Sequence, residues 1–145
     1  MVSRDGATDV LIVEDFEPFR RFISATLAKI RDLRVVCEVS DGLEAVKKAE
    51  ELKPDLILMD IGLPGLNGLD AARQILKLAP ESKIIFLSQE SSPDIVQEAL
   101  NLGALGYVVK ARAGIELLTT VESVLLEKQF VSPRSRNTEQ KCMQS

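Results

Sequence analysis

Carboxylates close two apolar runs of this sequence. Asp60 ends the run 56–59, and the pair Glu14-Asp15 ends the run 10–13 in the same way. Short apolar runs bounded by turn residues are typical of buried strands, so each carboxylate is expected where a strand leaves the core. In an open parallel sheet that edge is where ligands bind. Carboxylates gathered there repel one another unless a cation or a proton is shared among them.

Two further polar groups, Ser88 and Lys110, follow later strand-like runs and are expected at the same edge. The chain has no histidine, so acidic oxygens are the ligands on offer, and these suit a hard cation such as Mg²⁺. Asp60 could then attack phosphorus as a carboxylate nucleophile. The Ser88 hydroxyl and the Lys110 ammonium could each bind a phosphoryl oxygen. The predicted chemistry is phosphoryl transfer through positioning and charge compensation.

Apolar runs alternate with segments of helical period throughout the chain. Strands are predicted over 10–13, 33–39, 55–60, 83–88 and 106–109. Helices are predicted over 18–30, over 42–52, after an Asn67 cap, from Ser92-Pro93 to a stop at Gly103, and over 115–128. Strands spaced by helices favour right-handed crossovers, and hence a doubly wound five-stranded parallel sheet in a three-layer α/β/α sandwich.

Apolar positions within the helices predict which faces are buried. Helical spacing assigns two sets. The buried face of the helix after Asn67 should hold Leu69, Ala72, Ile75, Leu76 and Ala79, and core or interface packing in the last helix is expected of Ile115, Leu118, Val121 and Leu125. Phe16, Phe19 and Phe22 are expected in the core rather than as a platform for nucleic-acid bases, because no basic patch accompanies them.

The bulk composition fits one cytoplasmic domain. The chain has 145 residues and a net charge of −4, which gives no electrostatic support for nucleic-acid contact. No apolar stretch approaches the roughly 20 residues of a membrane span, and the first residues form no signal peptide. Cys37 and Cys142 are expected as reduced thiols. The predicted divisions are a disordered segment 1–8, a domain over 9–130, and a polar linker or disordered tail over 131–145.

The motifs, taken in order, resemble the receiver domain of two-component response regulators over about residues 9–130. The matching features are Glu14-Asp15, Asp60 with Pro64 and Gly68 downstream, Leu87-Ser88, and Tyr107 before Val108-Val109-Lys110. The resemblance implies a flavodoxin-like (CheY-like) fold. It also implies that Asp60 accepts a phosphoryl group from a sensor histidine kinase, and that such domains catalyse their own dephosphorylation without being enzymes otherwise.

By the same resemblance, Glu14, Asp15, Asp60 and the backbone carbonyl of Gly62 hold Mg²⁺. Ser88 is then the hydroxyl switch, and Tyr107 is the aromatic switch that turns inward when Ser88 moves toward the phosphoryl group.

The sequence departs from the family pattern at two places. Gln89 and Glu90 follow Ser88 where a small residue is common directly after the hydroxyl, and Glu90 adds acid near the pocket. Ala111 follows Lys110 where proline is usual, so no ring fixes the backbone there and a more mobile loop is expected.

Several functional alternatives stay open at this point. One is a Mg²⁺-dependent aspartyl-phosphate phosphohydrolase, although Gly62 stands where its second aspartate would be expected. A scaffold without phosphoryl chemistry is disfavoured by the complete acidic set, and nucleotide binding by the lack of a glycine-rich phosphate loop. The output is undecided between a downstream effector protein and a DNA-binding domain on a longer chain. A homodimer through the last helix is a further option.

Overall fold

The computed structural model describes residues 7–129 of the chain. Its strands are β1 (Thr8–Val13), β2 (Leu33–Val39), β3 (Leu56–Asp60), β4 (Lys83–Ser88) and β5 (Gly106–Val109). The helices are α1 (Glu17–Leu27), α2 (Gly42–Leu52), α3 (Gly68–Leu78), α4 (Pro93–Leu102), the 3₁₀ turn η1 (Lys110–Arg112) and α5 (Ala113–Gln129). Thr8 already belongs to β1, so the ordered chain starts earlier than the predicted boundary. The predicted tail 131–145 and Cys142 lie outside the described residues.

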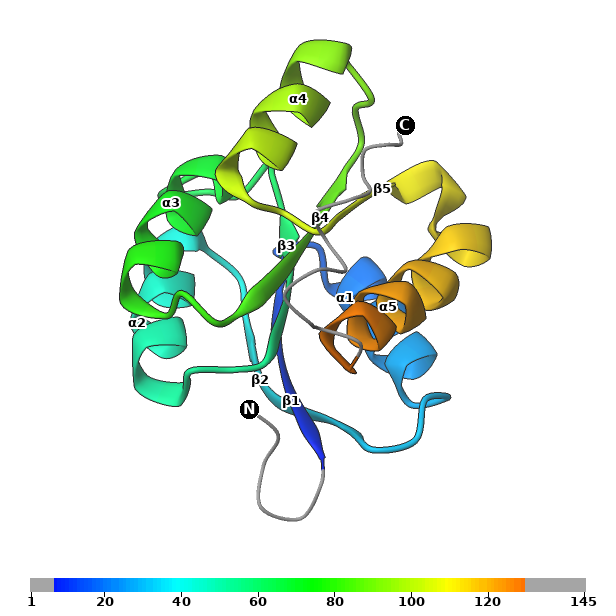
Figure 1. Ribbon diagram of the computed structural model, residues 1–145. Helices are drawn as coiled ribbons and strands as arrows, with labels where there is room; N and C mark the ends of the chain where they lie inside the picture. Colours follow the sequence, from blue (N-terminus) through cyan, green and yellow to red (C-terminus); the bar gives the residue numbers. More distant parts are fainter. Residues whose placement is uncertain (1–6, 130–145) are drawn as a thin grey trace.

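The five strands form one parallel sheet in the order β2-β1-β3-β4-β5, which is the flavodoxin-like arrangement. Helices α1 and α5 cover one face, and α2, α3 and α4 cover the other (Figure 1). Alternate residues of β1 show this division. Val10 and Ile12 pack with the α1 and α5 side, whereas Leu11 and Val13 pack with the α2 to α4 side. The predicted fold class is confirmed.

Helix ends follow local capping chemistry. The Asn67 side chain accepts a hydrogen bond from the Asp70 N–H at 2.9 Å, which confirms the predicted cap of α3. Gly103 ends α4 with a φ of 112°, a conformation that glycine adopts without steric cost. In contrast, the predicted helix 18–30 is too long. It ends at Leu27, and the N–H groups of Lys29 and Ile30 bond three residues back in a tightened turn before β2.

Within the stripe of the last helix predicted for core or interface packing, Val121 lies in the core, whereas Ile115 does not, since its exposed fraction is 76%. The helix begins at Ala113 and buries Ala113, Leu117, Val121 and Val124. Ile115 lies two positions from both Ala113 and Leu117 and therefore faces away from the sheet.

The prediction that Phe16 belongs to the core is also wrong, because the chain has already left β1 at this point and 60% of Phe16 is exposed. Phe19 and Phe22 do pack against the core. Within residues 7–129, no helix has the length and apolar character needed to cross a bilayer.

Gly68 brings the start of α3 directly against the end of β3. A Cβ added at Gly68 would lie 2.3 Å from the Asp60 carbonyl oxygen and 2.7 Å from the Ile61 Cα. The Gly68 N–H donates to the Ile61 carbonyl at 2.8 Å. Both neighbours are backbone atoms, so only glycine fits, and the close approach fixes the turn that follows Asp60.

Gly68→Ala should therefore lower the free energy of unfolding by about 1–3 kcal/mol, since the added methyl group must push two backbone segments apart. Urea denaturation followed by circular dichroism measures this change. Gly114→Ala is the matched control, because a Cβ there meets nothing within 4 Å and the position is helical. That control should be neutral or stabilising by up to about 1 kcal/mol. Equal stability of the Gly68 variant and wild type would show that the backbone at Asp60 and Ile61 leaves room for a Cβ at position 68.

Candidate functional site

The carboxyl ends of the strands bring the predicted polar groups together. Glu14 and Asp15 follow β1, Asp60 ends β3, and each offers a carboxylate oxygen within 4.8 Å of the other two. Glu14 and Asp60 are buried, whereas Asp15 is exposed. The site opens into a cleft of about 450 Å³ lined by residues that include Asp15, Asp60, Gly62, Ser88, Glu90 and Lys110.

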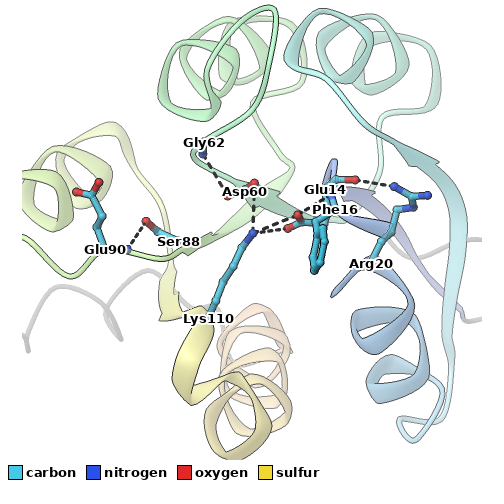
Figure 2. A network of polar contacts seen from close by, with 8 residues as sticks. All are labelled: Glu14, Phe16, Arg20, Asp60, Gly62, Ser88, Glu90 and Lys110. Atoms are coloured by element: carbon cyan, nitrogen blue, oxygen red, sulfur yellow. Dashed lines mark hydrogen bonds and ion pairs between the residues drawn. The ribbon is translucent and has the colours of Figure 1, made fainter. Parts of the chain in front are cut away.

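Lys110 enters this cluster from the residue directly after β5, and its side chain is only 13% exposed. Its Nζ lies 3.0 Å from Glu14 Oε1, 3.1 Å from Glu14 Oε2 and 3.4 Å from Asp60 Oδ2. Figure 2 shows the ammonium between the two carboxylates. Backbone groups fix the same side chains: the Phe16 N–H donates to Glu14 Oε2 at 3.0 Å, and the Gly62 N–H donates to Asp60 Oδ1 at 3.1 Å.

Electrostatics leave the cluster with too much negative charge. Burial raises the pKa of Glu14 above its usual value; Lys110 and the Phe16 N–H oppose this shift, and the Asp60 charge adds to it. Burial likewise raises the pKa of Asp60, against the Lys110 charge and the Gly62 N–H, with Asp15 adding to the rise. When ionised, the three carboxylates face one ammonium in this group.

The donor set fits a hard divalent cation. Glu14 Oε1 is fully buried and receives no aligned hydrogen bond, although the Lys110 ammonium lies close to it. A buried carboxylate oxygen needs positive partners, and a cation shared with Asp15 and Asp60 would add one to the Lys110 ammonium. Oxygen ligands of this kind are those that Mg²⁺ accepts while it keeps several waters.

Ser88 and Tyr107 are connected through the backbone of Glu90. The Ser88 Oγ accepts a hydrogen bond from the Glu90 N–H at 3.0 Å. The Tyr107 hydroxyl donates to the Glu90 carbonyl oxygen at 2.8 Å. Ser88 is buried at the end of β4, and Tyr107 pairs beside Phe86 on the neighbouring strand β5. The departure noted at Glu90 thus lies in the link between the two predicted switch residues.

The second departure, Ala111, lies in η1 rather than in an irregular loop. A 3₁₀ turn needs no proline at this position, and it leads directly into α5.

Arg20 is a residue of the site that the sequence did not single out. Its Nη1 donates to the Glu14 carbonyl oxygen at 2.8 Å (Figure 2). Its Nε lies 3.3 Å from Glu38 Oε1 on β2. The guanidinium therefore joins α1, the turn after β1 and the edge strand. The sequence offers one sign of this role. Arg20 lies one helical turn after Glu14-Asp15, and a long side chain at that position can reach back to the strand end.

Comparisons with known proteins agree with this geometry. The model of the response regulator receiver domain family matches residues 10–122. The response regulator GacA of Pseudomonas viridiflava is 35% identical over 125 residues, which are 86% of this chain and 58% of GacA. The chemotaxis protein CheY of Listeria monocytogenes is 36% identical over 112 residues, which are 77% of this chain and 94% of CheY.

A solved structure, the response regulator domain of Thermotoga maritima CheB, is 40% identical with a TM-score of 0.69. The match covers 84% of this chain and 92% of that one. The chain spans little more than half the length of the GacA relative and nearly all of the CheY relative. On the family match and these identities, the chain belongs to the response regulator receiver domain family and contains a receiver domain of the two-component type.

Proposed function

We propose that Asp60 accepts a phosphoryl group from a sensor histidine kinase in a Mg²⁺-dependent reaction. The observation that carries this proposal is the Lys110 ammonium, which lies within 3.4 Å of both Glu14 and Asp60 in a buried acidic cluster. An Asp60 carboxylate oxygen attacks phosphorus, the bond from phosphorus to the histidine nitrogen breaks, and an acyl phosphate forms. Lys110 and Ser88 then bind phosphoryl oxygens.

The proposed metal ligands are Glu14, Asp15, Asp60 and the backbone carbonyl of Gly62. Bound Mg²⁺ would compensate the charge of the phosphoryl oxygens. The residues of this chain hold the acceptor in place: the Gly62 N–H and Lys110 contact its two carboxylate oxygens. Burial raises the pKa values of Glu14 and Asp60, and a cation bound to both carboxylates would favour their ionised forms.

Arg20→Met should weaken Mg²⁺ binding about tenfold, as expected when a group that orients a metal ligand is lost. Arg20 contacts the Glu14 carbonyl, and its loss frees the peptide that carries Asp15. Isothermal titration calorimetry with Mg²⁺ measures the affinity. Arg21→Met is the matched control, because the Arg21 side chain is 77% exposed and its guanidinium pairs with Glu17 on the helix surface. Equal affinity of the Arg20 variant and wild type would remove Arg20 from the metal site.

The proposed output is a shift between two conformations of the surface formed by α4, β5 and α5. Ser88 and Tyr107 are the proposed switch, and the Glu90 backbone links them. Phosphorylation would bias an existing equilibrium rather than create a new state. A downstream effector protein, or a DNA-binding domain on a longer chain, reads that surface in the cytoplasm. A homodimer is a further form that this surface allows.

Phosphoryl acceptance and autodephosphorylation are the only chemistry proposed for this chain, which is not otherwise an enzyme. Family membership supports this interpretation over the phosphohydrolase alternative. Gly62 supports it too, since it provides no acid or base two residues after Asp60.

Beryllofluoride with Mg²⁺ tests the proposal, because the compound mimics a phosphoryl group on a carboxylate. The amide NMR signals around Ser88 and Tyr107 should move on addition of both components. Beryllofluoride without Mg²⁺ is the control and should leave the signals in place. A spectrum unchanged by the complete mixture would contradict the proposed function.

A further inference from the structure

The ring of Phe19 lies beneath the Lys110 ammonium. Lys110 Nζ is 4.9 Å from the ring centroid, within the distance at which the negative face of an aromatic ring attracts a cation. Phe19 is held in turn by Phe22, whose ring stacks on it with 5.5 Å between centroids and 29° between planes. Both residues come from α1, and they pack against the same core cluster.

This contact differs in kind from the other contacts of the ammonium. Within residues 7–129, Lys110 Nζ also contacts Glu14 and Asp60, which are the proposed metal ligands and phosphoryl acceptor. Those carboxylates change partners when a cation or a phosphoryl group is bound. The Phe19 ring binds neither and does not titrate, so it can attract the ammonium whatever those carboxylates bind.

The burial of the Lys110 side chain strengthens its attraction to the Phe19 ring. The Lys110 side chain is 13% exposed, and an apolar cleft of about 490 Å³ that includes Phe16, Phe19 and Phe22 borders it. Cation–π attraction is stronger where the cation is desolvated, and a buried ammonium needs such compensation.

We propose that Phe19 is a positioning residue for Lys110, one that keeps the ammonium directed at the phosphoryl oxygens while the carboxylates are engaged elsewhere. This inference rests on the proposed function. It goes beyond that function because it assigns a role in the reaction to an apolar residue of α1. It also explains why a ring, rather than an aliphatic side chain, stands beside the cluster.

The test compares phosphorylation by acetyl phosphate at saturating Mg²⁺, which avoids any effect on kinase docking. Phe19→Leu should lower the rate constant on the order of five- to tenfold, while Phe19→Trp should remain within about twofold of wild type. Trifluorophenylalanine at position 19 nearly keeps the shape but removes the negative ring face, so its rate should fall toward that of Phe19→Leu. Phe22→Leu removes the ring that stacks on Phe19 but leaves the Phe19 ring facing the ammonium, so its rate should lie between those of wild type and Phe19→Leu.

A second readout does not depend on the reaction. The ring current of Phe19 should shift the ε-methylene proton signals of Lys110 upfield in wild type, and Phe19→Leu should abolish that shift. Equal rates for wild type, the leucine variant and the fluorinated variant would overturn this inference alone. A wild-type protein that takes no phosphoryl group would overturn the proposed function and this inference with it, whatever the proton shift.

Discussion

Asp60→Asn protein is expected to gain no phosphoryl group from acetyl phosphate and Mg²⁺, whereas wild type gains one. An amide oxygen is uncharged and a poor nucleophile, so the bond to phosphorus cannot form at a useful rate. Intact-mass spectrometry of freshly reacted protein measures the transfer. Asp94→Asn is the control, because Asp94 lies exposed in the first turn of α4 and should leave the transfer intact.

The Asp60 variant should remain folded, which keeps the result interpretable. Asparagine has nearly the same shape as aspartate, and it removes a charge from a buried cluster that has excess negative charge. Its melting temperature in Mg²⁺-free buffer should therefore be no lower than that of wild type. Transfer to the Asp60→Asn protein at the wild-type level would place the acceptor on another residue.

Lys110→Met should slow phosphorylation by about 10²–10³-fold, the loss expected when one group that stabilises charge in the transition state is removed. Methionine keeps much of the apolar stem but has no ammonium to bind a phosphoryl oxygen. Rapid-quench kinetics with acetyl phosphate at saturating Mg²⁺ measures the rate constant. Lys47→Met, at an exposed position on α2, serves as the control.

The Mg²⁺ affinity of the Lys110 variant distinguishes a loss of transition-state stabilisation from a general loss of structure at the site. The ammonium competes with a cation for Glu14 and Asp60, since it lies 3.0 Å and 3.4 Å from their oxygens. Lys110→Met should thus bind Mg²⁺ at least as tightly as wild type while it reacts slowly. Slow reaction together with lost Mg²⁺ affinity would instead indicate that Lys110 supports the shape of the metal site.

Most strand and helix limits could be predicted because local chemistry sets them. Strand β4 was predicted with its observed ends, and helix α2 lies between Gly42 and the Lys53-Pro54 stop. Helix α1 was predicted too long because Ile30 keeps the helical period although the chain has already turned. In α5, Val121 and Leu125 pack as predicted, but Ile115 was placed with them because the first residue, Ala113, is too small to mark the buried side by pattern.

The residues of the candidate site also fall into those that the sequence predicts and those that it does not. Glu14, Asp60 and Lys110 stand at strand ends, and the parallel topology alone brings them to one edge. Arg20 and Phe19 could not be found by that route, because their contacts depend on the rotation of α1 against the sheet and on side-chain reach. Residue spacing puts Arg20 within reach of the strand end, but it determines neither the rotation of the helix nor the side-chain contact.

The link between Tyr107 and Glu90 has a consequence for how such a domain can diversify. The tyrosine hydroxyl is bound by the main-chain oxygen of residue 90, not by its carboxylate. Every amino acid carries that oxygen, so the side chain at position 90 can be exchanged while the bond to Tyr107 is kept. Residue 90 also lines the cleft beside Asp60. A substitution at position 90 is therefore expected to change the lining of the cleft while the bond to Tyr107 is kept.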